Sequence, residues 1–227
     1  MKHRFITGLF LAGALAAPAP QEKCAPGPHI ITVRESSAPP DGGFVRDLAN
    51  EVQAKLNESD IESDIEDVDY PAWFVPYVHS ETEGVKKARE AIENYVESCP
   101  QTDIILLGYS QGAHAIGDVL CGTNNPLFGK SDPLPTANLG DHVKAVVLMG
   151  DPGHEPGVSF DVGTSTKPGL FHRFTDIECP GYSDKIQSYC DSNDPFCDRG
   201  LNQNVHNGYI KEYGDQAVKF VVAKVQG

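Results

Sequence analysis

A serine between two glycines, where an apolar run meets a helix-like segment, limits the folds open to this chain. Residues 108–112 read GYSQG and fit the pattern G-x-S-x-G. The β-forming run Ile104–Leu107 precedes this motif, and the helix-like segment Ala113–Leu120 follows it. A strand–turn–helix junction of this kind is so tight that side chains beside the serine would collide, so glycines stand there. The motif predicts a turn that presents the Ser110 hydroxyl as a nucleophile; an inert serine in a glycine-rich turn is the alternative.

Segments with strand character alternate with segments of helix character along the chain. Strands separated by helices predict an α/β fold with a mainly parallel sheet that is covered on both faces. One segment, Ile61–Tyr70, alternates apolar and polar residues, which favours a strand near the edge of the sheet. The Pro- and Gly-rich stretch Thr123–Asp141 is predicted to be a surface loop. The remaining predicted strands are His29–Arg34, Asp103–Leu107 and Val143–Met149, and the remaining predicted helices are residues 44–56, Gly84–Cys99 and Val205–Val225.

A nucleophilic serine needs a base, and the chain order on a sheet of this kind is serine, then acid, then histidine. Five histidines follow Ser110. His206 stands after the acidic candidates and at the start of the last predicted helix, where a loop can bring it over the sheet. His114 lies one helical turn beyond Ser110 and is expected to point away. Chain order therefore favours His206 as the base, against the alternative of a solvated histidine at a helix start.

Chain order does not choose among three candidate acids, Asp191, Asp194 and Asp198. A disulfide between the cysteines at 190 and 197 would close a short loop around Asp194 and hold it rigidly. Pro195 restricts the backbone of Asp194 further. Such fixing suits a residue that orients an imidazole, whereas a turn-forming aspartate before proline is the alternative.

The first residues have the pattern of a cleaved export signal. Lys2 and Arg4 precede the apolar stretch Phe5–Leu15, which is too short to span a bilayer, and a small-x-small site predicts cleavage after Ala16. An amphipathic first helix is the alternative. We expect a signal peptide over residues 1–16, a short extension over 17–23 and a single domain over 24–227. The mature protein is predicted to be secreted and extracellular.

Six cysteines in an exported chain predict three disulfides, and spacing singles out only the loop from 190 to 197. A zinc site is the alternative, but no C-x-x-C or H-E-x-x-H pattern occurs, so no metal is expected. Asn57 begins one N-glycosylation sequon. The cysteines are Cys24, Cys99, Cys121, Cys179, Cys190 and Cys197.

The formal charge of the chain argues against two classes of partner. Thirty-two acidic residues against 18 Lys and Arg give a net charge of −14. Such a chain would repel the phosphates of nucleic acids and the surface of anionic membranes. We expect no nucleic-acid partner, no stable membrane insertion and, by default, a monomer.

Several motifs together resemble the cutinase and acetylxylan esterase family, carbohydrate esterase family five. They are residues 108–113 (GYSQGA), 121–122 (CG), 149–152 (MGDP), 188–197 (SYCDSNDPFC) and 205–209 (VHNGY). The resemblance runs in order from about Cys24 to the C-terminus. It implies a small lidless α/β-hydrolase, a three-layer sandwich with a central parallel sheet of five strands.

The resemblance also implies roles for individual residues. Ser110 matches the nucleophile, Asp194 the acid and His206 the base. The hydroxyl of Ser36 and the backbone N–H of Gln111 match the oxyanion hole. The family needs no metal or cofactor. Its disulfides imply the pairs Cys24–Cys99, Cys121–Cys179 and Cys190–Cys197.

The chain departs from the family at two further bridges that some acetylxylan esterases carry. Ser165 and Asp198 occupy the two ends of one of them. Near Pro71, where the other would fall, the chain has residues 73–78 (WFVPYV) instead. The cluster from Trp73 to Tyr77 is either a substrate-facing lip or ordinary packing.

The resemblance predicts a serine esterase that works through an acyl-enzyme. Phe196 is the aromatic residue that favours the acetylxylan branch, so acetyl or short acyl esters on plant polysaccharide are the preferred substrates. The Trp73 cluster supports the alternative of a cutinase acting on cutin or longer lipid-like esters. Trp73, Phe74 and Phe196 are the candidate pocket residues. A secreted, non-catalytic binding protein on the same fold is a further alternative.

Overall fold

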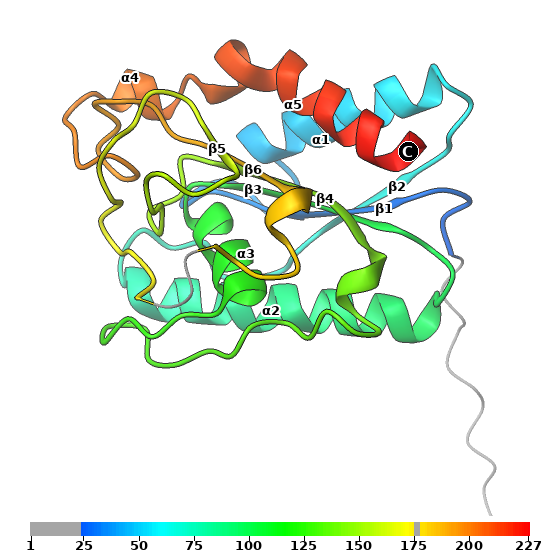
Figure 1. Ribbon diagram of the computed structural model, residues 1–227, viewed down its shortest axis with the longest axis horizontal. Coiled ribbons are helices and arrows are strands. Elements are labelled where there is room, and N and C mark those ends of the chain that lie inside the picture. The colour runs from blue at the N-terminus through cyan, green and yellow to red at the C-terminus, as the bar shows by residue number, and fades with distance from the viewer. Residues whose placement is uncertain (1–23, 175–177) are drawn as a thin grey trace, which may run out of the picture.

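One parallel sheet runs through the middle of the molecule, and helices cover both of its faces (Figure 1). The computed structural model describes residues 24–174 and 178–227. The predicted signal peptide and the extension up to residue 23 lie outside this described part. The strand order is β2-β1-β3-β4-β6-β5, and every neighbouring pair is parallel. The strands are β1 (His29–Val33), β2 (Asp64–Asp67), β3 (Ile104–Tyr109), β4 (Val143–Met149), β5 (Asp161–Val162) and β6 (Ile186–Tyr189).

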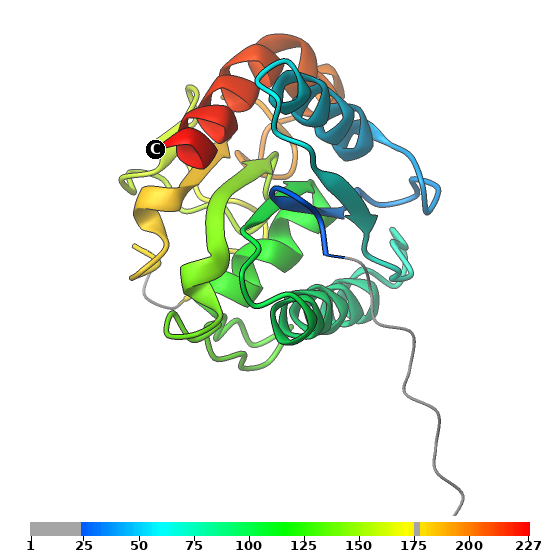
Figure 2. The same cartoon turned by 90° about the vertical axis from the view of Figure 1, so that its right-hand side faces the viewer.

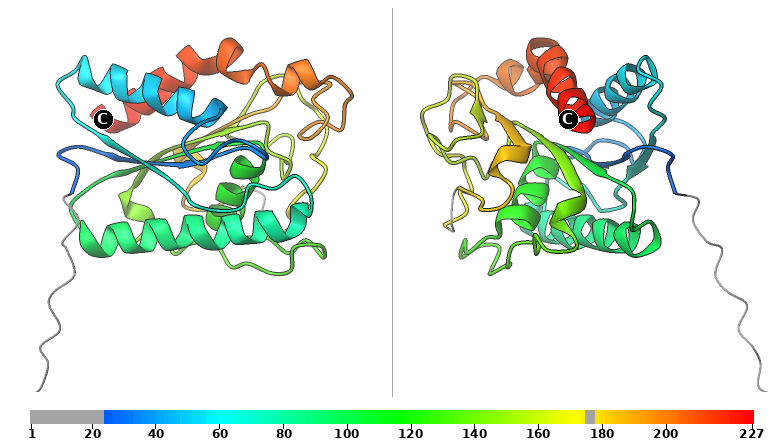
Figure 3. Two further views of the ribbon diagram at one scale, coloured as in Figure 1. Left: turned by 180° about the vertical axis from the view of Figure 1, so that it is seen from behind. Right: turned by 45° about the vertical axis from the view of Figure 1, so that its right-hand side comes forward.

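The helices form two layers, which are clearest end-on in Figure 2. Helices α1 and α5 lie side by side on one face, and α2 and α3 lie on the other (Figure 3). None of the helices within the described residues is both long and apolar enough to cross a membrane. The helices are α1 (Phe44–Asn57), α2 (Tyr77–Ser98), α3 (Gln111–Cys121), α4 (Gln203–His206) and α5 (Tyr209–Gln226), with short 3₁₀ turns at Gly140–His142 and Ser183–Lys185.

Alternation along the strands builds a core on each face of the sheet. Ile105 and Leu107 are buried beneath α1 and α5, whereas Ile104 and Leu106 are buried against α2 and α3. Burial of an aliphatic side chain of this size contributes about 1.5–3 kcal/mol relative to exposure. Two covered faces explain why the strand reads as a continuous apolar run in the sequence.

The sheet has six strands, so the expectation of five is wrong in number although the α/β-hydrolase fold is confirmed. The extra strand, β5, has two residues and pairs only with β6 at the sheet edge. Sequence analysis also missed β6, because Gln187 and Ser188 interrupt its short apolar pattern. The predicted edge strand is correct in place: β2 pairs with β1 at the opposite edge, over a shorter range than expected.

Two predicted helices have different bounds in the structure. Helix α2 begins at Tyr77 rather than Gly84, so Tyr77 belongs to a helix and not to a loop. The predicted helix Val205–Val225 is divided into α4 and α5 by Asn207 and Gly208. Because of this break, His206 is the last residue of the short helix α4 and is not part of the long helix α5.

Three disulfides join the pairs that the family resemblance implies. A hydrogen bond occupies the place where relatives were expected to have a further bridge: the Ser165 hydroxyl donates to Asp198 Oδ1 over 2.7 Å.

Candidate active site

Ser110 stands alone between β3 and α3 in a strained backbone conformation. Its φ of 51° and ψ of −116° lie outside the usual regions for residues with a Cβ, a strain that costs about 1–3 kcal/mol. A Cβ at Gly112 would overlap the carbonyl oxygen of Val33, and one at Gly108 would lie 2.8 Å from Ala113 Cα. Both glycines therefore let α3 start against the ends of β1 and β3, the arrangement that the motif predicted.

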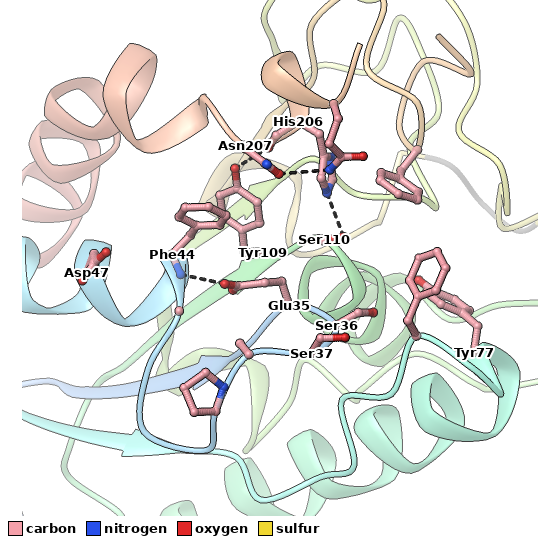
Figure 4. Close-up of a pocket in the computed structure, with 16 residues that line it drawn as sticks. Glu35, Ser36, Ser37, Phe44, Asp47, Tyr77, Tyr109, Ser110, His206 and Asn207 are labelled. Carbon is pink, nitrogen blue, oxygen red and sulfur yellow. Dashed lines mark hydrogen bonds between the residues drawn. The ribbon is translucent and has the colours of Figure 1, made fainter. Parts of the chain in front are cut away.

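A hydrogen-bonded chain links Ser110 to His206 and Asp194, which come from three separate segments (Figure 4 shows the serine and histidine). The Ser110 hydroxyl lies 2.9 Å from His206 Nε2 and donates to it. The other ring nitrogen, Nδ1, lies 2.8 Å from Asp194 Oδ2 and donates to it. All three residues are buried. This is the geometry in which an imidazole removes a proton from a serine while a carboxylate holds its orientation.

Four donors hold the Asp194 carboxylate. The backbone N–H groups of Phe196 and Cys197 donate to Oδ1 over 2.7 and 3.0 Å. The Tyr209 hydroxyl donates to Oδ2 over 2.9 Å, beside the bond from His206. The cystine loop therefore fixes the acid through its own backbone, as the sequence argument for a rigid loop expected.

The position of Tyr209 at this acid was not expected from the sequence. Residue 209 was singled out there only as the end of the motif 205–209. Burial, followed by the charge of Asp194, raises the pKa of Tyr209, so the hydroxyl stays protonated and can only donate to the carboxylate. The one available signal was its position three residues after His206, on the first turn of α5.

The other candidate acids have hydrogen-bond partners other than the histidine. Asp191 accepts hydrogen bonds from Tyr213 and Thr164. Asp198 accepts from Ser165 and from the backbone N–H of Asn193. Of the three candidate acids, only Asp194 is hydrogen-bonded to His206 among the described residues.

Of the two residues that the resemblance implies for an oxyanion hole, Ser36 lines the same cavity as Ser110, and Gln111 directly follows Ser110 in the chain. The Ser36 hydroxyl is buried, has no hydrogen-bond partner within the described part of the chain and lies at the same cavity as Ser110 (Figure 4). Gln111 is the first residue of α3, and the first N–H groups of a helix have no acceptor within the helix. These two donors are thus available to a negative oxygen beside Ser110.

The side chain of Gln111 is anchored away from the cavity. Its Nε2 donates to the carbonyl oxygen of Trp73 over 3.1 Å, and its Oε1 accepts from the Ser80 hydroxyl over 3.0 Å. The Trp73 N–H donates to the same hydroxyl over 2.8 Å. This network couples the segment before α2 to the backbone that follows the serine.

A cavity of about 500 Å³ opens beside Ser110. Phe74 and Phe196 line it, and their rings meet edge to face with centroids 6.4 Å apart. Trp73 does not line this cavity, in contrast to its place among the candidate pocket residues. Its side chain is 49% exposed and its ring lies near that of His79. Tyr77, the end of the predicted cluster, lies in the wall of the cavity.

A buried ion-pair cluster lies behind this wall. The Arg173 guanidinium contacts Asp151 Oδ2 at 2.9 Å and Asp118 Oδ1 at 2.6 Å. Burial alone would raise the pKa of Asp151, yet the charge of Arg173 and several hydrogen bonds hold it below its ordinary value. For Asp118, burial outweighs the same guanidinium and raises the pKa to about 7. Asp151 is therefore the ionised partner of Arg173.

His114 belongs to this cluster and not to Ser110. Its Nδ1 lies 3.2 Å from the Tyr77 hydroxyl, and burial lowers its pKa to about 3. Glu81, His114 and Asp118 bring ligand atoms within 4.8 Å of one another, the arrangement among the described residues that could hold a metal ion. Arg173 already supplies a positive charge next to Asp118, 2.6 Å from its Oδ1.

The chain is similar to known esterases in both sequence and structure. The model of the Cutinase family matches residues 24–225. Acetylxylan esterase 2 of Talaromyces purpureogenus is 33% identical over 97% of this chain and 97% of its own. Cutinase 11 of Verticillium dahliae is 35% identical over 96% of this chain and 76% of its own. The solved catalytic core domain of acetyl xylan esterase from Trichoderma reesei is 35% identical, with a TM-score of 0.79 over 88% of this chain and 98% of that domain.

The matches confirm the resemblance that the motifs carried. They cover nearly all of the described residues and include both branches, acetylxylan esterases and cutinases. The chain therefore belongs to the Cutinase family and is a carboxylic ester hydrolase of the acetylxylan esterase or cutinase type.

Proposed function

We propose that this protein is a secreted serine esterase that removes acetyl or other short acyl groups from plant polysaccharide. The observation that carries the proposal is the unbroken hydrogen-bonded chain from Ser110 through His206 to Asp194 at a cavity beside the free Ser36 hydroxyl.

The reaction proceeds in two acyl-transfer steps. Ser110 Oγ attacks the ester carbonyl while His206 Nε2 takes its proton, and the charge that develops on His206 faces Asp194. His206 then gives the proton to the departing alcohol. A water molecule, activated by the same imidazole, hydrolyses the acyl-enzyme and restores Ser110.

The carbonyl oxygen becomes negative in both steps. We assign its stabilisation to the Ser36 hydroxyl and the Gln111 backbone N–H. Loss of one such donor typically costs about 2.7–4 kcal/mol of transition-state binding. The buried position of Ser36 supports this role, because a low-dielectric site strengthens the bond to an oxyanion.

Two observations favour short acyl groups. Acetylxylan esterase 2 of Talaromyces purpureogenus and the catalytic core domain of the Trichoderma reesei enzyme are similar over nearly their whole length. Phe74 and Phe196 meet edge to face in the lining of the cavity that also contains Ser110.

The second candidate is a cutinase acting on cutin or longer lipid-like esters. Cutinase 11 is as similar in sequence as the acetylxylan esterases. Trp73, Phe74 and Val75 are also exposed next to one another, an apolar surface that suits a waxy substrate.

We propose extracellular action on a plant cell-wall ester. The signal-like segment over residues 1–16 and the three disulfides support export. Asn57 is exposed at the end of α1, where a glycan has room, and its modification stays a prediction.

The test is kcat/KM on p-nitrophenyl esters from C2 to C16, with Ser110→Ala as the control. Steep loss beyond C2 to C4 is expected if the cavity closes around an acetyl group. A maximum at longer chains would favour the cutinase. Activity retained in a folded Ser110→Ala variant would overturn the assigned nucleophile.

A further inference from the structure

The direction of proton transfer decides where the alcohol part of the ester lies. His206 Nε2 must reach the leaving oxygen in order to protonate it, so the alcohol lies next to His206. His206 is the last residue of α4, and two other residues at this end of the chain, Gln203 and Asn207, line the same cavity. Both are exposed. The surroundings of the leaving alcohol therefore include two amide side chains, together with the Phe196 ring, whose centroid lies 4.5 Å from that of the His206 ring.

The two amides are held in a fixed relation. Gln203 Nε2 donates to Asn207 Oδ1 over 3.0 Å, one helical turn along. This bond leaves the acceptor Gln203 Oε1 and the donor Asn207 Nδ2 unused. Among residues 24–174 and 178–227 neither side chain makes a further hydrogen bond, so both groups are available to a ligand.

An acidic residue completes this side of the cavity. Asp47, on the first turn of α1, is exposed and lines it. Figure 4 shows Asn207, Phe44 and Asp47 on one side of the cavity and Tyr77 on the other. Glu35 holds this wall in place, because its Oε1 accepts from the Phe44 N–H over 2.8 Å at the start of α1. Asp47 forms no ion pair within the described residues.

We propose that Gln203, Asn207 and Asp47 form a subsite for the hydroxyl groups of a neutral sugar that carries the ester. The inference rests on the proposed function and deepens it by placing the sugar. A carboxylate and two amides supply acceptors and a donor that match sugar hydroxyls. A negatively charged sugar would be repelled by Asp47. A long-chain aliphatic alcohol would leave these groups desolvated and unpaired, which opposes its binding.

The experiment compares two acetate esters that differ in the alcohol. Acetylated xylo-oligosaccharide offers sugar hydroxyls, whereas p-nitrophenyl acetate offers none. Gln203→Ala and Asp47→Asn should each lower kcat/KM on the oligosaccharide by about 3- to 10-fold, mainly through KM, and leave p-nitrophenyl acetate within about twofold. The matched controls, Asn204→Ala on α4 and Asp41→Asn before α1, are exposed and lie outside the cavity lining, so neither substrate should be affected.

Each other result contradicts a distinct claim. If the wild type cleaves the oligosaccharide and both Gln203→Ala and Asp47→Asn cleave it equally well, the subsite alone is overturned. Equal losses on both esters also overturn it, because they indicate a disturbed His206. A wild-type enzyme that cleaves p-nitrophenyl acetate but not the oligosaccharide overturns the proposed substrate, and the subsite with it.

Discussion

The carboxylate of Asp194 has its bonding capacity filled by donors from three parts of the chain. Two backbone N–H groups, the Tyr209 hydroxyl and the His206 ring all donate to it. An amide in its place would keep one acceptor oxygen but would present an NH₂ group to other donors. The orientation of His206 therefore depends on a carboxylate at this position.

The first prediction separates Asp194 from its neighbour Asp198. Asp194→Asn should lower kcat by about 10⁴-fold, because the imidazole takes the wrong tautomer. Asp198→Asn should leave kcat within a few-fold and lower Tm, because Asp198 binds Ser165 and Asn193 and not the histidine. Steady-state kinetics on p-nitrophenyl acetate measures both. The reverse order of effects would move the acid to Asp198.

The second prediction concerns Tyr209 as a positioning residue. Tyr209→Phe removes a buried hydrogen bond to a charged group, so kcat should fall by about 10-fold with little change in KM. The pH profile of kcat should shift as well, because the charge that faces His206 loses one donor. Tyr213→Phe is the control: its hydroxyl bonds to Asp191, so it should alter stability but not the pH profile. Identical profiles for both variants would exclude the positioning role.

At the level of elements, one disulfide closes a short loop and another joins two segments that are far apart in the chain. The bridge between Cys190 and Cys197 closes a loop that carries Asp194. The bridge between Cys121 and Cys179 joins the end of α3 to a distant loop. Chain entropy makes the short bridge worth about 2.5 kcal/mol and the long one about 4 kcal/mol of unfolding free energy.

The third prediction follows from this contrast. Removal of the short bridge by Cys190→Ala with Cys197→Ala should lower kcat at temperatures below unfolding, because Asp194 loses its fixed frame. Removal of the long bridge by Cys121→Ala with Cys179→Ala should cost more Tm but leave kcat of the folded fraction nearly unchanged. Activity and circular dichroism recorded on the same samples test this. Unchanged kinetics without the short bridge would show that the loop is rigid by itself.

At the scale of the whole molecule, the buried cluster around Arg173 makes stability depend on pH. Burial raises the pKa of Asp118 from 3.8 to about 7, so the folded state retains a proton that the unfolded chain loses. The stabilising contribution is full below about pH 4 and disappears as pH rises through about 7. Burial, followed by the charge of Asp118, also raises the pKa of Glu81. His114 acts oppositely: its pKa is lowered, so its contribution fades as pH falls from 6.5 toward about 3.

The fourth prediction isolates Asp118 from these groups. Asp118→Asn cannot titrate, so the Tm of wild type minus the Tm of the variant should be larger at about pH 4.5 than at about pH 7.5. Thermal unfolding of both proteins at the two pH values measures the change. A constant difference would mean that Asp118 has the same charge throughout this range.

The sequence by itself determined the class of fold and the turn that carries Ser110. Apolar runs between helices encode a parallel sheet, and glycines beside Ser110 encode its turn, because both depend on backbone conformation and near neighbours. Chain order favoured His206 as the base, and the cystine loop together with the family motifs favoured Asp194 as the acid. The sixth strand was not visible, since a two-residue pairing leaves no periodic pattern.

Only the tertiary structure decided which side chains meet. The Arg173 contact with Asp118 and the bond from the Gln111 side chain to the Trp73 carbonyl join segments that are distant in the chain. The Tyr209 hydroxyl reaches Asp194 from a different element, the first turn of α5. The serine and the histidine are themselves 96 residues apart. Local patterns record the conformation of a segment, whereas a hydrogen-bond partner is set by how the layers pack and which face each helix presents.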